Sequence, residues 1–152
     1  METEFEVLLD VIRHVSEVQE NMEDIAHDLK MRSISHDRSK FDDPEFSTFV
    51  RTRPEFRVAN YGTPEYEAVV EKAREGVDHH YANNRHHTAY HPNGVKDMNL
   101  LDLLEMLADW KAASRRSPDL TFMDSLPRAF KKYEMDETIQ TLMRNTIEYL
   151  SW

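Results

Sequence analysis

The chain of 152 residues contains no cysteine. This absence excludes disulfide bonds, thiolate metal sites and cysteine nucleophiles, so any metal ion must be held by histidine, carboxylate or amide side chains and by water. Only 3 glycines and 6 prolines occur, which favours helices and argues against an all-β or a Rossmann-type fold. No run of about 18 apolar residues is present, so we expect no membrane-spanning helix.

The charge balance is strongly acidic, with 19 Lys and Arg against 29 Asp and Glu and a net charge of −10. Affinity for nucleic-acid backbones comes from contacts between cations and phosphates, so we expect no strong nucleic-acid binding. The first four residues, Met-Glu-Thr-Glu, lack the basic region of a secretory signal. The sequence therefore predicts a soluble, cytoplasmic protein that does not act at a membrane.

Hydrophobic periodicity predicts an all-α fold. Apolar residues recur in steps of three and four between residues 8 and 29, which indicates an amphipathic helix over about 4–31. Residues 51–63 are expected to be irregular, and one long helix is expected from residue 64 to before 91. Further helices are expected over 100–114, 125–133 and 136–150. Residues 1–152 are thus predicted to form one domain, a bundle of five or six helices.

A histidine and a His-Asp pair in the first third are candidate metal ligands. His14 lies three residues after Val11 and so shares the apolar face of the first helix, while His36-Asp37 follows the end of that helix. An imidazole nitrogen and a carboxylate oxygen together suit a divalent ion of borderline hardness. The alternative is a core histidine, together with an aspartate that only caps a turn.

Five of the eight histidines lie between residues 79 and 91. His80 follows Val77 by three residues and therefore shares the apolar face, and His87 lies seven residues further on. A polar helix end with solvated rings is the alternative to a metal or phosphate site. Because the cluster begins on the apolar face, we favour a site, although the spacing leaves open which of His79, His80, His86 and His87 bind the ion.

A stripe of carboxylates follows on the helix predicted over 100–114, at Asp102, Glu105 and Asp109. Like charges at this spacing repel one another unless a cation lies between them. Asp109 is the best candidate ligand because its neighbours, Ala108, Trp110, Ala112 and Ala113, make that helix end tightly packable. Asp102 and Glu105 could orient a ligand histidine. The alternative is a solvated acidic face.

Taken in order, His14, the His36-Asp37 pair and Asp109 resemble the pattern of the HD-domain superfamily of metal-dependent phosphohydrolases. The segments His-Asp-Arg-Ser-Lys-Phe at 36–41 and His-Tyr-Ala-Asn-Asn-Arg-His-His at 80–87 are similar to motifs of short bacterial and phage proteins of unknown function. The likeness covers about residues 10–115 and leaves the helices at 120–150 outside. It implies an HD-like bundle in a bacterial cell or a phage-infected host.

The resemblance also implies a reaction, the hydrolysis of a small phosphate ester by a hydroxide generated on a divalent ion. A nucleotide is the substrate class expected from the analogy of fold. The residues implied as ligands of the ion are His14, His36, Asp37 and Asp109. His80 and His87 are suited to a second ion, and the metal could be Mn, Fe, Co, Ni, Zn or Mg.

Five further residues receive roles in this reaction. Lys40 would neutralise the charge that develops on the phosphoryl oxygens. His86 would give a proton to the leaving oxygen. The residues expected to bind the substrate are Asn84, Arg85 and Arg115.

Two other functions fit the same residues. HD-type folds with additional histidines include di-iron proteins that activate oxygen. A non-enzymatic interaction protein that holds a structural metal is the third interpretation. The aromatic residues of the last third would then serve packing or a homodimer contact.

Overall fold

The computed structural model describes residues 3–60, 62–115 and 121–152. Within these ranges the protein is all-α, with seven α-helices, three short 3₁₀ turns and no β-strand. The predicted fold class is therefore confirmed, although the structure has one helix more than the largest number expected. Contacts divide the chain into two compact units, residues 1–36 and 37–152, which are described separately. Among the described helices, none combines the length and the apolar character needed to cross a membrane.

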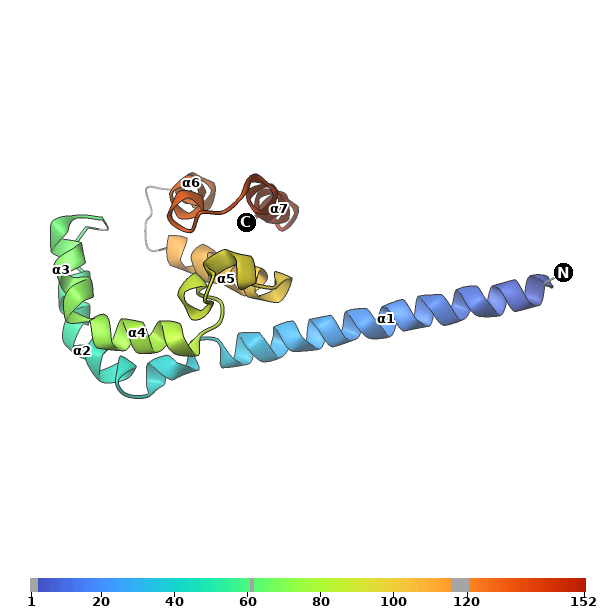
Figure 1. Cartoon of the computed structure of the whole chain (residues 1–152), viewed down its shortest axis with the longest axis horizontal. Coiled ribbons are helices and arrows are strands. Elements are labelled where there is room, and N and C mark those ends of the chain that lie inside the picture. The colour runs from blue at the N-terminus through green and yellow to red at the C-terminus, as the bar shows by residue number, and fades with distance from the viewer. Residues whose placement is uncertain (1–2, 61, 116–120) are drawn as a thin grey trace. The chain divides into compact units, whose positions relative to one another are not determined.

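The first unit consists of one uninterrupted helix, α1 (Glu4–Ser35), which is four residues longer than the periodicity predicts (Figure 1). A capping box fixes its start. The Thr3 hydroxyl accepts a hydrogen bond from the backbone N–H of Glu6, and the Glu6 carboxylate accepts from the backbone N–H of Thr3 at 2.7 Å. None of the 32 residues of α1, all of them described, is buried.

Two predictions for the part of the second unit before residue 84 differ from the structure. Helix α2 (Glu45–Phe56) covers half of the segment expected to be irregular, and the expected long helix is two helices, α3 (Pro64–Lys72) and α4 (Arg74–Asn83). Both predictions were wrong for a reason of packing. Pro54 lies near the C-terminal end of α2 and removes only one of its intrahelical hydrogen bonds, so the rest of the helix is kept. The break at the fully buried Ala73 lets both α3 and α4 contact α2.

Helices α2 and α4 run antiparallel and pack closely. The buried side of α2 carries Glu45, Thr48 and Thr52, and the buried residues of α4 are Gly76 and His80. A Cβ atom on Gly76 would lie only 2.8 Å from Cβ of Thr48. Glycine at this position therefore allows the close approach that brings Glu45 beside His80.

The main hydrophobic core lies among the last three helices, α5 (Leu100–Ser114), α6 (Phe122–Lys132) and α7 (Glu137–Tyr149). The helix predicted over 100–114 is confirmed. Helix α6 begins three residues earlier than expected because Thr121 and Asp124 form a capping box. The buried core residues are Val95, Met106, Leu107, Phe122, Leu126, Phe130, Met135, Met143 and Ile147.

Three 3₁₀ turns connect these layers, and two of them flank the candidate site. Turn η1 (Arg38–Phe41) follows Asp37, and η2 (Thr88–Tyr90) follows His87. Turn η3 (Gly94–Asp97) leads into α5. Two of the three turns contact α4, so the histidines at the end of α4 lie between them.

Candidate metal centre

Four side chains of the second unit converge on one point: Asp37, His80, His86 and His87. Each offers one ligand atom, and these four atoms all lie within 4.8 Å of one another. Asp37 precedes η1, His80 lies in the last turn of α4, and the two other histidines belong to the segment between α4 and η2. Three imidazole nitrogens and one carboxylate oxygen therefore form a cluster that could hold a metal ion.

Polar groups lie close to both ring nitrogens of His80. Its Nδ1 atom lies 2.9 Å from Oε2 of Glu45, and a carboxylate can only accept, so Nδ1 carries the proton. The lone pair of Nε2 then points into the cluster, where Nε2 of His87 lies at 2.8 Å and Oδ1 of Asp37 at 3.4 Å. Burial and the Glu45 contact together fix one tautomer and one ring orientation.

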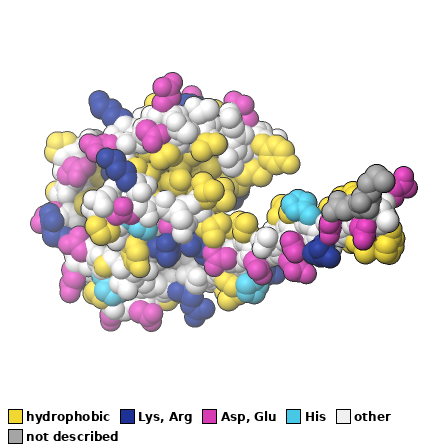
Figure 2. All heavy atoms as spheres, turned by 45° about the vertical axis from the view of Figure 1, so that its right-hand side comes forward, with side chains coloured by type: hydrophobic (Ala, Val, Ile, Leu, Met, Phe, Trp, Pro, Cys, Tyr) yellow, Lys and Arg dark blue, Asp and Glu magenta, His cyan; other side chains and the backbone are white. Residues whose placement is uncertain are grey.

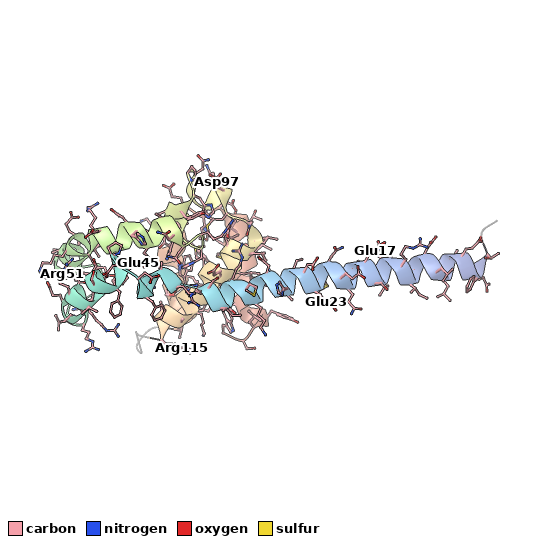
Figure 3. The ribbon with its side chains drawn as sticks, turned by 90° about the horizontal axis from the view of Figure 1, so that it is seen from below. Glu17, Glu23, Glu45, Arg51, Asp97 and Arg115 are labelled. Carbon is pink, nitrogen blue, oxygen red and sulfur yellow. The ribbon has the colours of Figure 1, made fainter. Side chains whose placement is uncertain are left out.

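Glu45 is the functional residue that the sequence analysis missed. Its side chain is fully buried at the start of α2 (Figure 3), and its second oxygen, Oε1, lies 2.8 Å from Nδ1 of His79. The carboxylate of Glu45 thus contacts the Nδ1 atoms of two neighbouring histidines, His79 and His80. The only signal in the sequence is the 45, 48, 52 spacing of small or polar residues, and that spacing becomes informative only once α4 is placed beside α2.

His86 has the same arrangement with a different carboxylate. Its ring is 1 % exposed, with Nδ1 at 3.3 Å from Oε1 of Glu105 on α5 and Nε2 at 3.6 Å from Oδ1 of Asp37. The expectation that Glu105 could orient a ligand histidine therefore agrees with this geometry. Oδ1 of Asp37 therefore faces the Nε2 atoms of two histidines from different segments of the chain, His80 and His86.

Asp37 has an uncommon backbone conformation, and its carboxylate pairs with a positively charged side chain. Its φ angle of +56° lies in the left-handed region, which aspartate tolerates better than most residues. Oδ2 of Asp37 forms an ion pair with Nζ of Lys40, whose side chain is 40 % exposed. The cation expected to act on phosphoryl oxygens therefore lies at the cluster, on the side that reaches solvent.

Two imidazoles of the cluster, those of His80 and His87, are kept neutral. Burial and the nearby rings of His86 and His80 lower the pKa of His87 to about 3, against the opposing effect of the Asp109 and Asp37 carboxylates. The pKa of His80 is also lowered, mainly by burial. Neutral imidazole is the form that binds a metal ion, so the site is prepared for binding near neutral pH.

An ion pair braces the segment that carries His86 and His87. The Arg85 guanidinium donates to both oxygens of the fully buried Asp102, at 2.6 and 3.0 Å. The backbone carbonyl of Arg85 lies 2.8 Å from Nε2 of His91. Arg85, expected to bind the substrate, is thus engaged in holding the segment to the start of α5.

The remaining predicted site residues lie in different places. Asp109 is half-buried on α5, and its ligand atom lies within 4.8 Å of that of Asp37. The buried Asn84 donates to Ser39 Oγ at 2.6 Å, which ties η1 to α4. Arg115 lies at the exposed end of α5 (Figure 3).

Two predicted ligands belong to the first unit. His14 is an exposed residue in the middle of α1, and His36 follows the last residue of α1 and directly precedes Asp37. Their contribution to a metal site stays a prediction.

These features define an all-α protein with a mixed histidine and carboxylate centre that could hold a metal ion. The chain belongs to the DUF5662 family, a family of unknown function, which matches residues 3–151. No curated protein and no solved structure matches it.

Proposed function

We propose that the protein is a metal-dependent phosphohydrolase that acts on a small phosphate ester. The ion is held by Asp37, His80, His86 and His87. This donor set, with three nitrogens and one oxygen, suits Mn, Fe, Co, Ni or Zn better than Mg, which prefers oxygen ligands throughout.

The observation that carries the proposal is the carboxylate at Nδ1 of two buried imidazoles, Glu45 for His80 and Glu105 for His86. Histidines that bind metals almost always donate their other ring N–H to such a group, which fixes the tautomer and raises the basicity of the ligand nitrogen. Both of these histidines face the same oxygen of Asp37. A buried polar network would not need this arrangement for its stability alone.

A divalent ion bound at this cluster supplies Lewis-acid chemistry, because it polarises a phosphoryl oxygen and lowers the pKa of a coordinated water to about 7. Lys40 places a positive charge beside Asp37 at the exposed side, where it binds the phosphoryl oxygens of the substrate. The half-buried carboxylate of Asp109, close to Asp37, accepts the proton of the attacking water. His86 is assigned to the ligand set here, because its ring is buried, its Nδ1 lies 3.3 Å from Glu105 and its Nε2 lies 3.6 Å from Oδ1 of Asp37.

A nucleotide is the substrate class we propose. The ring of Tyr81 lies 4.8 Å from the ring of His87, so a half-buried aromatic surface adjoins the cluster and could stack on a base. The acidic net charge does not oppose this, because the ion and Lys40 would place positive charge on the solvent-facing side of the cluster, where the phosphate binds.

The test uses the full chain, purified without a histidine tag. Phosphate release is measured from a panel of nucleoside monophosphates and sugar phosphates with added Mn²⁺, Co²⁺ or Zn²⁺, and bound metal is measured by elemental analysis. We expect Asp37→Asn to lose metal and at least about 100-fold in turnover, since a ligand matters more than the residue that orients it.

The matched control is Asp42→Asn, which removes an exposed carboxylate five residues away and should keep wild-type turnover and metal content. Metal binding without phosphate release from any ester would overturn the phosphohydrolase proposal. Oxygen consumption by the iron-loaded protein would then identify the di-iron alternative.

A further inference from the structure

The apolar side chains of α1 follow a seven-residue repeat. Between residues 8 and 29 they advance in alternating steps of three and four. The members, named here the heptad stripe, are Leu8, Val11, Val15, Val18, Met22, Ile25 and Leu29. A period of 3.5 kept over three repeats is typical of a helix that winds around another helix, because an undistorted helix has a period of 3.6 and a 3.5 stripe drifts around it.

The heptad stripe is exposed. Six of its seven members, all except Leu29, have between 41 and 65 % of their surface accessible, and none of the residues of α1 is buried. Figure 2 shows hydrophobic side chains on the surface of α1 beside acidic ones. The stripe is about 33 Å long at 1.5 Å per residue. A continuous apolar surface of this length marks an interaction site.

Between residues 8 and 29, all charged residues except Asp28 lie at repeat positions that do not flank the stripe. Glu17, Glu20 and Glu23 lie at the third, sixth and second repeat positions, which do not flank the stripe. The positions that flank the centre of the stripe carry His14, Gln19, Asn21 and Ala26, none of which is a carboxylate. Two such helices can therefore meet without placing carboxylates against each other, even though the chain carries a net charge of −10.

We propose that the heptad stripe is an interface at which α1 forms a coiled coil with α1 of a second copy of this chain. A second copy fits because it brings the same 3.5-residue period, which a partner must match to remain in contact over three repeats. Leucine at two of the four first repeat positions, Leu8 and Leu29, and β-branched residues at every fourth position favour three or four helices over two. The expected assembly is therefore two or more copies joined through α1.

The test measures the mass of the full chain in solution by light scattering after size-exclusion chromatography. Val18→Glu places a carboxylate in the middle of the stripe, and the matched control Ser16→Glu places it on the opposite side of α1. We expect the wild type and Ser16→Glu to have at least twice the monomer mass, and Val18→Glu to be monomeric.

A second measurement covers the case in which Val18→Glu fails to fold. The chain has no cysteine, so Val18→Cys introduces a single thiol at the centre of the stripe, where helices of either relative direction bring two copies together. We expect an oxidised covalent dimer for Val18→Cys and none for Ser16→Cys. A monomeric wild type would overturn the proposal and would indicate that the stripe packs on its own chain. An assembly that survives Val18→Glu, or equal cross-linking of both cysteine variants, would overturn it as well.

Discussion

Replacing Glu45 by glutamine tests how the cluster orients its ligands. The fully buried carboxylate accepts from Nδ1 of both His79 and His80, at 2.8 and 2.9 Å. Glutamine has the same shape but only one acceptor oxygen, and its NH₂ group faces the other imidazole. One ring must then lose its hydrogen bond or move its proton to Nε2. If this ring is His80, the proton occupies the nitrogen that faces the ion.

Two magnitudes follow from this geometry. Loss of the group that orients a ligand histidine typically weakens metal binding about 10–100-fold, so we expect the Kd of Glu45→Gln for Zn²⁺ or Co²⁺ to rise by that factor. Loss of one hydrogen bond to a charged acceptor should lower the free energy of unfolding in EDTA by about 1.5–3 kcal/mol. Isothermal titration calorimetry and urea unfolding measure the two quantities.

Glu55→Gln is the matched control because Glu55 lies on the same helix and forms a largely exposed ion pair with Lys72. Such pairs contribute about 0–1 kcal/mol, so this variant should retain the wild-type Kd and nearly all of the stability. An unchanged Kd in Glu45→Gln would refute the role of Glu45 as the group that orients His80.

Three further outcomes are expected. Gly76→Ala should lower the free energy of unfolding by about 1 kcal/mol, because the clash with Thr48 outweighs the gain in helix propensity; a more stable variant in urea unfolding would show that α2 and α4 tolerate separation. Asp102→Asn should lower the free energy of unfolding by about 1–3 kcal/mol in the same assay, since it breaks the ion pair between the buried Asp102 and Arg85, whose side chain is 46 % exposed. A loss below the error of the assay would contradict the role of this ion pair in holding the segment to α5. Because the pKa of His87 is lowered from 6.5 to about 3 in the folded chain, the unfolded chain binds a proton at His87 between these two pH values that the folded chain does not bind. The stability of the metal-free protein should therefore fall as the pH is lowered from 6.5 to 3, and it should fall less steeply in His87→Gln.

The elements with a clear local pattern could be predicted from sequence. Helix α5 spans residues 100–114, as its apolar period predicts, and the structure shows Asn99 as the residue that caps its start. The interpretation of residues 51–63 as irregular failed because Pro54 is a local signal, whereas the packing of Thr48 against Gly76 of α4 is not. The break at Ala73 carries no sequence signal, since alanine is the best helix former.

By itself, the amino-acid sequence determined the helical class, the exclusion of thiolate chemistry and the wealth of histidine between residues 79 and 91. Only the tertiary structure decided which groups those histidines face. His80 and Glu45 are 35 residues apart, and Arg85 and Asp102 are 17 apart. Hydrogen bonds over such separations depend on how helices pack, and helical periodicity shows which face of a helix is apolar but not which neighbour covers it.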